Sequence, residues 1–233
     1  MKFLYIALLS VFFLSCQKTE VKIPVNDNPG LNKIWDNSRI YILINEEGGD
    51  QNAELKLGQV ITTTHWLVAV DKRLSMKKLV KPIEKILKKR HKKSVHTKEG
   101  AHAYFSYLDS VNKKMAFIDF DSIQLMSDIY TSKKYFEKYS KADINMQKFH
   151  ITILQDDIVL NDTIHFDSSL SKQQLTDSLW KIMSKKTNEK QNRLYLNFDV
   201  NMNFDRFLNY YTFFKNNPMP KGKLSNKIFI FKP

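Results

Sequence analysis

Apolar and polar side chains recur along this chain with two different periods, which together predict a mixture of helices and strands. Within residues 71–89 the apolar positions lie three and four residues apart, the spacing of an amphipathic helix. Residues 167–185 repeat that spacing. A serine precedes each apolar run, so we expect Ser75 and Ser171 to be N-caps, and Gln174 to complete a capping box with Ser171.

Segments rich in β-branched and aromatic residues flank both expected helices and are typical of strands. We expect strands over residues 39–44, 67–70, 102–108, 149–154, 163–166, 193–199 and 227–231, and further helices over 127–141 and 203–214. Residues 115–120 are open to two interpretations: a strand that pairs back through a turn at 112–114, or the start of a helix. Pro82 should kink or divide the first amphipathic helix.

The two amphipathic helices resemble each other residue by residue. At a constant offset, seven of the 19 positions in 71–89 and 167–185 are identical, and strands flank both. The sequence therefore predicts an α+β fold of two repeated units, residues 31–145 and 146–233, each a small mixed sheet with helices packed on one face. The alternative is a chance likeness between two helices rich in Lys and Leu.

The composition is that of a globular protein and excludes several classes of site. Of the 233 residues, 42% are hydrophobic and 26% are charged, which excludes a collagen-like or wholly disordered chain. The six glycines form no glycine-rich phosphate loop. A single cysteine allows neither an internal disulfide nor a cysteine zinc cluster.

The N-terminus has the pattern of a secretion signal. Lys2 precedes an uncharged run over residues 3–15, which is too short to span a bilayer. Ser15 followed by Cys16 resembles the lipobox of bacterial lipoproteins, although the usual leucine three residues before the cysteine is Phe13 here. The resemblance implies cleavage before Cys16 and lipidation of its thiol. The alternative is an ordinary signal peptide with a chance cysteine.

This interpretation divides the N-terminus into a signal peptide, residues 1–15, and a flexible tether, residues 16–30, that contains Pro24, Pro29 and Gly30. The expected location is the cell envelope, with the N-terminal lipid as membrane anchor and the outer membrane favoured over the inner one. Whether the protein faces the periplasm or the cell surface stays open.

The second half resembles the periplasmic domain of the ExbD/TolR family of biopolymer-transport proteins. A strand, a hairpin, a helix, a strand, a helix and a final strand follow one another over residues 149–231. Residues 196–199, Leu-Asn-Phe-Asp, stand where the family has a strand of the type valine-x-isoleucine-x-alanine-aspartate. The resemblance implies a binding or scaffolding role in an envelope protein complex linked to biopolymer transport. The family's proton-carrying aspartate has no counterpart, because the N-terminal apolar run contains no acid.

Catalytic and metal-binding patterns are weak. The six histidines, His65, His91, His96, His102, His150 and His165, form no zinc-protease spacing, and no Gly-x-Ser-x-Gly elbow occurs. Asp119 and Asp121 would share one face of a strand, where they either bind a cation or form a solvated edge. We therefore expect no enzyme, no metal and no cofactor.

Positive charge is concentrated along the first amphipathic helix. The formal net charge is +13, and residues 71–99 contain 12 basic and three acidic residues. The expected anion-binding residues are Lys77, Lys81, Lys85, Lys88, Lys89, Arg90, Lys92 and Lys93. Anionic lipid or polysaccharide is the expected partner; nucleic acid is not, because aromatic residues do not interleave with this run. The alternative is a merely solvated helix face.

These features support three hypotheses of different classes. The first is a non-enzymatic envelope lipoprotein with ExbD/TolR-like domains that binds proteins or envelope polymers. The second is a surface lipoprotein that binds an anionic ligand or membrane through the basic helix face. The third is an enzyme of unknown type.

Lipidation of Cys16 is directly testable. Cells that express the wild-type chain in the presence of labelled palmitate should incorporate the label into the protein, whereas the Cys16→Ala variant should not, because it lacks the acceptor thiol. Gel autoradiography measures the difference. Equal labelling of the two proteins would contradict the lipobox interpretation.

Overall fold

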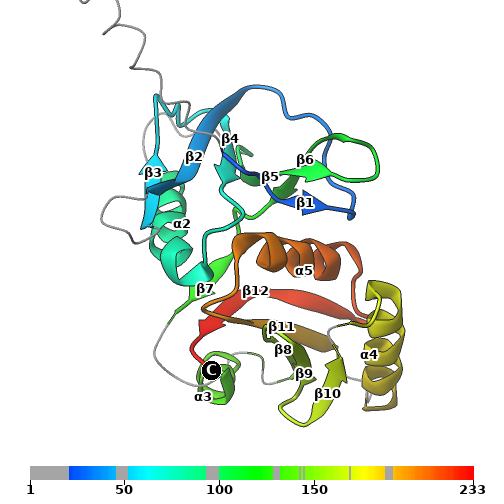
Figure 1. The fold of residues 1–233 in the computed structure, drawn as a ribbon. Helices are drawn as coiled ribbons and strands as arrows, with labels where there is room; N and C mark the ends of the chain where they lie inside the picture. Colours follow the sequence, from blue (N-terminus) through cyan, green and yellow to red (C-terminus); the bar gives the residue numbers. More distant parts are fainter. Residues whose placement is uncertain are drawn as a thin grey trace, which may run out of the picture.

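Two six-stranded mixed sheets, with helices between and around them, make up the fold (Figure 1). The structure is a computed structural model that describes residues 21–45, 52–92, 100–127, 132–141, 143, 145–167, 169–186 and 191–233. The signal peptide, Cys16 and Lys93 lie outside the described residues. The expectation of an α+β chain with mixed sheets is confirmed.

The first sheet contains the order β5-β4-β2-β3, in which β5, β4 and β2 are mutually parallel and β3 is antiparallel to β2. Two further strands join β5: β6 is antiparallel to it, and the short β1 is parallel to its C-terminal end. The strands are β1 (Val25–Asn26), β2 (Asn37–Asn45), β3 (Asn52–Lys56), β4 (His65–Val70), β5 (Ala103–Asp109) and β6 (Lys114–Asp119). The strand alternative for residues 115–120 is thereby confirmed.

The second sheet has the order β10-β9-β8-β11-β12-β7. Strands β8, β11, β12 and β7 are parallel, and β9 and β10 extend the sheet as antiparallel hairpins. The strands are β7 (Gln124–Met126), β8 (Gln147–Ile153), β9 (Asp157–Leu160), β10 (Ile164–Asp167), β11 (Asn192–Asp199) and β12 (Gly222–Phe231). Strand β7, which lies within the expected first unit of residues 31–145, pairs with β12 in this second sheet.

Four helices occur in the described part of the chain: α2 (Met76–Arg90), α3 (Ser132–Tyr139), α4 (Lys172–Lys186) and α5 (Phe204–Asn216). Helix α2 covers one face of the first sheet, and α5 lies between the two sheets (Figure 1). Helix α3 packs on the other face of the second sheet, where Phe136 meets the ring of Tyr195 edge to face with centroids 5.3 Å apart. The expectation that helices cover only one face of each sheet is therefore wrong for the second sheet.

The larger hydrophobic core joins the two sheets. The expected core residues of both amphipathic helices are buried: Leu79, Ile83, Leu175 and Leu179 are at most 2% exposed. Phe204 of α5 is also fully buried, and its ring packs edge to face on Phe105 of the first sheet, with centroids 5.1 Å apart. The main core is consequently continuous between the two sheets, and a small second cluster of Tyr195 and Phe229 lies on the face of the second sheet that α3 covers.

The first turns of α2 and α5 cap each other through their backbones. The N–H groups of Met76 and Lys77 donate to the carbonyls of Met202 and Val200 at 2.8 and 2.7 Å. In return, the N–H of Phe204 donates to the carbonyl of Leu74 at 2.8 Å. These donors have no partner inside their own helices, so each helix start satisfies the other.

This arrangement changes the role of the expected caps. Ser75 stands at the N-cap of α2, but its side chain makes no capping hydrogen bond, because carbonyls of residues 200–202 have taken the free donors. The capping box of α4 is confirmed: Gln174 Oε1 accepts from the N–H of Ser171 at 3.0 Å. Pro82 lies inside α2 and does not divide it.

The expected equivalence of α2 and α4 is wrong. Strand β4, which leads into α2, is central in its sheet, whereas β10, which leads into α4, lies at an edge. Helix α5 stands in the place comparable to α2, because both connect neighbouring parallel strands in the orders β3-β2-β4-β5 and β9-β8-β11-β12. Any two amphipathic helices have similar surfaces, so the sequence likeness of α2 and α4 does not make them equivalent. Their flanking strands show that they occupy different places in the two sheets.

The expected tether is part of the fold from residue 21 onwards. Asn26 and Asn28 are 2% and 7% exposed, and the Tyr107 hydroxyl donates to the carbonyl of Asn28 at 3.0 Å. Burial, with a smaller effect of Asp109, raises the pKa of Tyr107 to about 12, so this hydroxyl stays a donor. A side chain at Gly30 would lie 2.8 Å from the carbonyl of Phe117. The segment is therefore packed rather than flexible.

The core position of α2 can be tested against an exposed position on the same helix. Leu79→Ala should lower the free energy of unfolding by about 2–5 kcal/mol, because it leaves a cavity in the core. Lys81→Ala, on the solvent side, should change it by less than about 0.5 kcal/mol. Urea unfolding followed by circular dichroism measures both. Equal effects of the two variants would contradict the packing described for α2.

Candidate functional site

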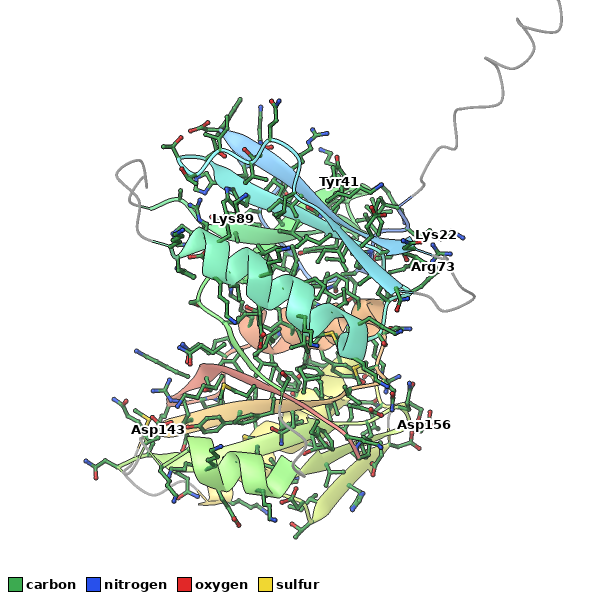
Figure 2. The ribbon with its side chains drawn as sticks, turned by 90° about the vertical axis from the view of Figure 1, so that its left-hand side faces the viewer. Lys22, Tyr41, Arg73, Lys89, Asp143 and Asp156 are labelled. Atoms are coloured by element: carbon green, nitrogen blue, oxygen red, sulfur yellow. The ribbon has the colours of Figure 1, made fainter. Side chains whose placement is uncertain are left out.

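One candidate surface is the solvent side of α2. Figure 2 looks onto this helix, with Lys89 near its C-terminal end and Arg73 just before its start. The expected lysines of the helix and Lys92 are all exposed, and none of them forms an ion pair with another described residue; they are Lys77, Lys81, Lys85, Lys88, Lys89 and Lys92. The helical spacing of the first four places them on one stripe.

Arg90 does not belong to this surface, although the sequence placed it there. Its residue is only 5% exposed, and its Nη1 donates to the carbonyls of Thr62 and Thr64 at 2.9 and 3.0 Å. Asp121 lies 3.8 Å from its Nε, and its guanidinium stands over the ring of Trp66. Burial lowers the pKa of Arg90, with Asp121 opposing the shift. The side chain therefore stabilises the loop before β4.

Four of the five described histidines lie beside an aspartate in separate local pairs, and the fifth, His65, stacks on His102 with ring centroids 6.4 Å apart. His102 Nδ1 lies 2.9 Å from Asp119, and His150 Nε2 lies 2.9 Å from Asp162. The remaining pairs are His91 with Asp121 and His165 with Asp157; His96 lies outside the described residues. Among the described side chains, no three His, Cys, Asp or Glu groups come together in a way that would hold a metal ion.

Asp119 and Asp121 are engaged by the protein itself. Oδ1 of Asp119 accepts from the N–H of Asp121 at 2.8 Å, and Oδ1 of Asp121 accepts from the N–H of Ala103 at 3.2 Å. Their carboxylates thus hold the turn after β6 and the start of β5. This arrangement favours the structural interpretation of the pair over a cation site.

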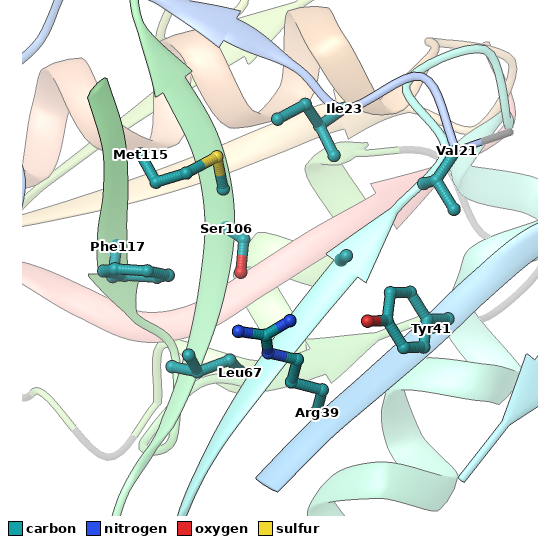
Figure 3. Close-up of a pocket in the computed structure, with 9 residues that line it drawn as sticks. Val21, Ile23, Arg39, Tyr41, Leu67, Ser106, Met115 and Phe117 are labelled. Atoms are coloured by element: carbon teal, nitrogen blue, oxygen red, sulfur yellow. The ribbon is translucent and has the colours of Figure 1, made fainter. Parts of the chain in front are cut away.

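The second candidate surface is a pocket of about 320 Å³ on the face of the first sheet that lies opposite α2 (Figure 3). Its floor crosses four strands, β2, β4, β5 and β6, and its rim is formed by the segment that precedes β1. The lining residues are Val21, Ile23, Arg39, Tyr41, Leu67, Ala69, Ser106, Met115 and Phe117.

Small side chains in the middle of the floor create the hollow. Ala69 is paired with Tyr41 across β2 and β4, and Ser106 is paired with Phe117 across β5 and β6. Side chains on one sheet face stand side by side, so a small residue flanked by larger ones leaves a depression. The pocket is therefore a consequence of strand register.

Its polar groups are few and lie together. The guanidinium of Arg39 and the hydroxyl of Tyr41 project toward each other over the floor, with Ser106 nearby (Figure 3). Arg39 forms no ion pair with any described residue, and none of the described lining residues carries a carboxylate. An unpaired cation above an apolar floor has the chemistry of a receptor for a singly charged amphiphile.

A buried aspartate fixes the rim of the pocket. Asp71 is 1% exposed and accepts from the backbone N–H and the guanidinium of Arg73 at 2.8–3.0 Å. It also accepts from the N–H of Lys22 at 3.4 Å, between the rim residues Val21 and Ile23. Burial alone would raise the pKa of Asp71, but the hydrogen bonds and the charge of Arg73 outweigh it and lower the pKa.

The sequence did not indicate this pocket. An alternating strand at 39–44 places Arg39 and Tyr41 on one face, which is the only local signal. The register that brings them beside Ala69 and Ser106 depends on pairing between strands far apart in the chain.

Comparison with protein-family models, with curated proteins and with solved structures finds no match for this chain. No helix in the described ranges is both long and apolar enough to cross a bilayer.

The role of Asp71 predicts a pH dependence. Its carboxyl has a lowered pKa in the folded protein, so its stabilisation is complete above the unfolded pKa of about 3.9 and is lost as the pH falls through the folded value. Asp71→Asn should therefore be about 1–3 kcal/mol less stable than wild type at pH 7, and the gap should narrow below about pH 4. Urea unfolding at several pH values measures it.

The exposed Asp156→Asn variant serves as the control and should follow wild type throughout. A stability gap for Asp71→Asn that stays constant from pH 7 to pH 3 would show that the charge of Asp71 is not what stabilises the fold.

Proposed function

We propose that this protein is a non-enzymatic, lipid-anchored component of the cell envelope that binds anionic envelope surfaces through α2. The observation that carries the proposal is the stripe of exposed lysines, Lys77, Lys81, Lys85 and Lys88, none of which is neutralised by a described acid. Surface lysines in globular proteins commonly alternate with acids, whereas only Glu84 interrupts this helix. Unbalanced charge of one sign attracts polyanions.

The fold presents this stripe rigidly. The opposite side of α2 is fixed in the core by Met76, Leu79 and Ile83, and its N-terminus is capped by residues 200–202. The lysines are therefore already held in place, and no part of the helix has to become ordered when a ligand binds. Near an anionic membrane each Lys contributes about 1 kcal/mol, and less as salt rises. A lipid on Cys16 would hold the domain close to such a surface.

We also propose that the chain contains two related units, with α2 equivalent to α5 rather than to α4. Both helices follow a central parallel strand and an aspartate, Asp71 or Asp199. Their buried positions share one spacing: Met76, Leu79, Val80, Ile83 and Ile86 in α2, and Phe204, Phe207, Leu208, Tyr211 and Phe214 in α5. Strand β10 and helix α4 would then be an insertion in the second unit.

The ExbD/TolR-like character of residues 149–231 supports a second candidate function, a scaffold in an envelope protein complex. The order of strands and helices from β8 to β12 agrees with the element order on which that resemblance rests. In such a complex a partner protein would bind directly to the surface of this protein. That binding would not depend on anionic lipid.

Binding to vesicles tests the proposal. The chain from Gln17 onwards keeps every residue of the described fold and carries no lipid. It should co-sediment with vesicles that contain anionic phosphatidylglycerol at low salt, and not with purely zwitterionic vesicles. Changing Lys77, Lys81, Lys85, Lys88 and Lys89 to Gln should weaken binding at least tenfold, because five charges of the stripe are removed.

A matched control removes five exposed lysines elsewhere: Lys114, Lys141, Lys181, Lys185 and Lys232. This variant has the same net charge, and its binding should stay within about threefold of wild type. If both variants lose binding equally, net charge rather than the α2 stripe is responsible. If wild type does not bind anionic vesicles at low salt, the stripe is a solvated surface and the proposal is wrong.

A further inference from the structure

The pocket on the first sheet has a chemistry that the α2 surface does not share. Six of its nine described lining residues are apolar, and the one charged group among them is the guanidinium of Arg39, which forms no ion pair with a described residue. We propose that this pocket binds a fatty-acid-like ligand, an unbranched apolar chain that ends in one carboxylate. The chain would lie on the apolar floor, and the carboxylate would meet Arg39.

The polar groups define the head of the ligand. A guanidinium presents paired N–H donors that match the two oxygens of a carboxylate. The hydroxyl of Tyr41, which points toward Arg39 in Figure 3, is a further donor for the same head group. A cationic ligand would face Arg39 without a carboxylate to balance it, because no residue of the described lining carries one.

The walls define the tail. Leu67 of β4 and Phe117 of β6 border the floor on either side of β5, and Met115, which is 39% exposed, stands at the open side. Ile23 covers the hollow from the N-terminal segment. A volume of about 320 Å³ lies at the lower end of the range for small-molecule pockets, which suits a slender chain rather than a ring system or a whole phospholipid.

The site is independent of the proposed membrane-binding surface. Arg39 and Tyr41 project from the face of β2 opposite to Ile40 and Ile42, whose fully buried side chains belong to the core with α2. The lysine stripe and the pocket therefore lie on different sides of the first sheet. Substitutions in one are expected to leave binding at the other unchanged, so the two proposals can fail separately.

Titration calorimetry with dodecanoate, below its micellar concentration, tests the site in the chain from Gln17 onwards. Wild type should bind one dodecanoate per chain. Arg39→Gln should weaken binding about tenfold or more, because the charge-assisted hydrogen bonds are lost. Arg39→Lys, which keeps the charge without the planar pair of donors, should weaken binding less than Arg39→Gln.

A second variant tests the floor. Ala69→Leu fills the hollow with an apolar side chain and should also weaken dodecanoate binding at least tenfold, while the melting temperature without ligand stays close to that of wild type. The exposed Lys181→Gln on α4, far from the pocket, is the charge-matched control and should bind as wild type does. Loss of binding in both Arg39→Gln and Ala69→Leu would locate the ligand in this pocket.

Related ligands separate the alternatives. Dodecanol, which has the same chain without the charge, should bind much more weakly than dodecanoate; equal binding would show that Arg39 does not recognise the head group. Dodecyl phosphate should bind less well than dodecanoate, because one guanidinium balances only one of its charges. Tighter binding of dodecyl phosphate, or no binding of dodecanoate to wild type, would overturn the proposal.

Discussion

The mutual capping of α2 and α5 is the interaction on which the rest of this structure depends. Their first N–H groups have no partner within their own helices and donate instead to carbonyls before the other helix. The loops that follow β4 and β11 must therefore meet back to back. This contact fixes the position of the two sheets relative to each other, and it lets Phe204 enter the core beneath the first sheet.

The segment before β1 depends on that junction and completes it. Asp205 of α5 accepts from the N–H of Val25 at 3.0 Å, and Asp71 accepts from the N–H of Lys22, so both helix starts hold this segment. Because it is held there, Val21 and Ile23 stand over the open face of the first sheet. A bare depression between strands thereby becomes a pocket with a rim.

The first sheet and its helix α2 carry both surfaces for which anion binding is proposed. On one side α2 presents many exposed lysines but no pocket. Such a surface suits an extended anionic partner, and the affinity should depend strongly on salt. On the other side a single arginine stands above an apolar hollow, which suits a small amphiphile. A protein held at a membrane by the proposed lipid on Cys16 would meet both kinds of ligand, and the two surfaces can be altered independently.

The sequence by itself determined the local features of the chain. Helical spacing predicted α2 with Leu79 inside and Lys81 outside, and the pair Ser171 and Gln174 predicted a capping box; these depend on neighbours within a few turns. Only the tertiary structure decided that α5, and not α4, connects neighbouring parallel strands as α2 does, that Arg90 is buried beside Thr62 and Thr64, and that residues 21–30 are packed. Each of these results depends on contacts between segments far apart in sequence. Strand pairing and competition for free backbone N–H donors decide which segments meet. The local periodicity of the sequence contains no information about strand pairing or about that competition.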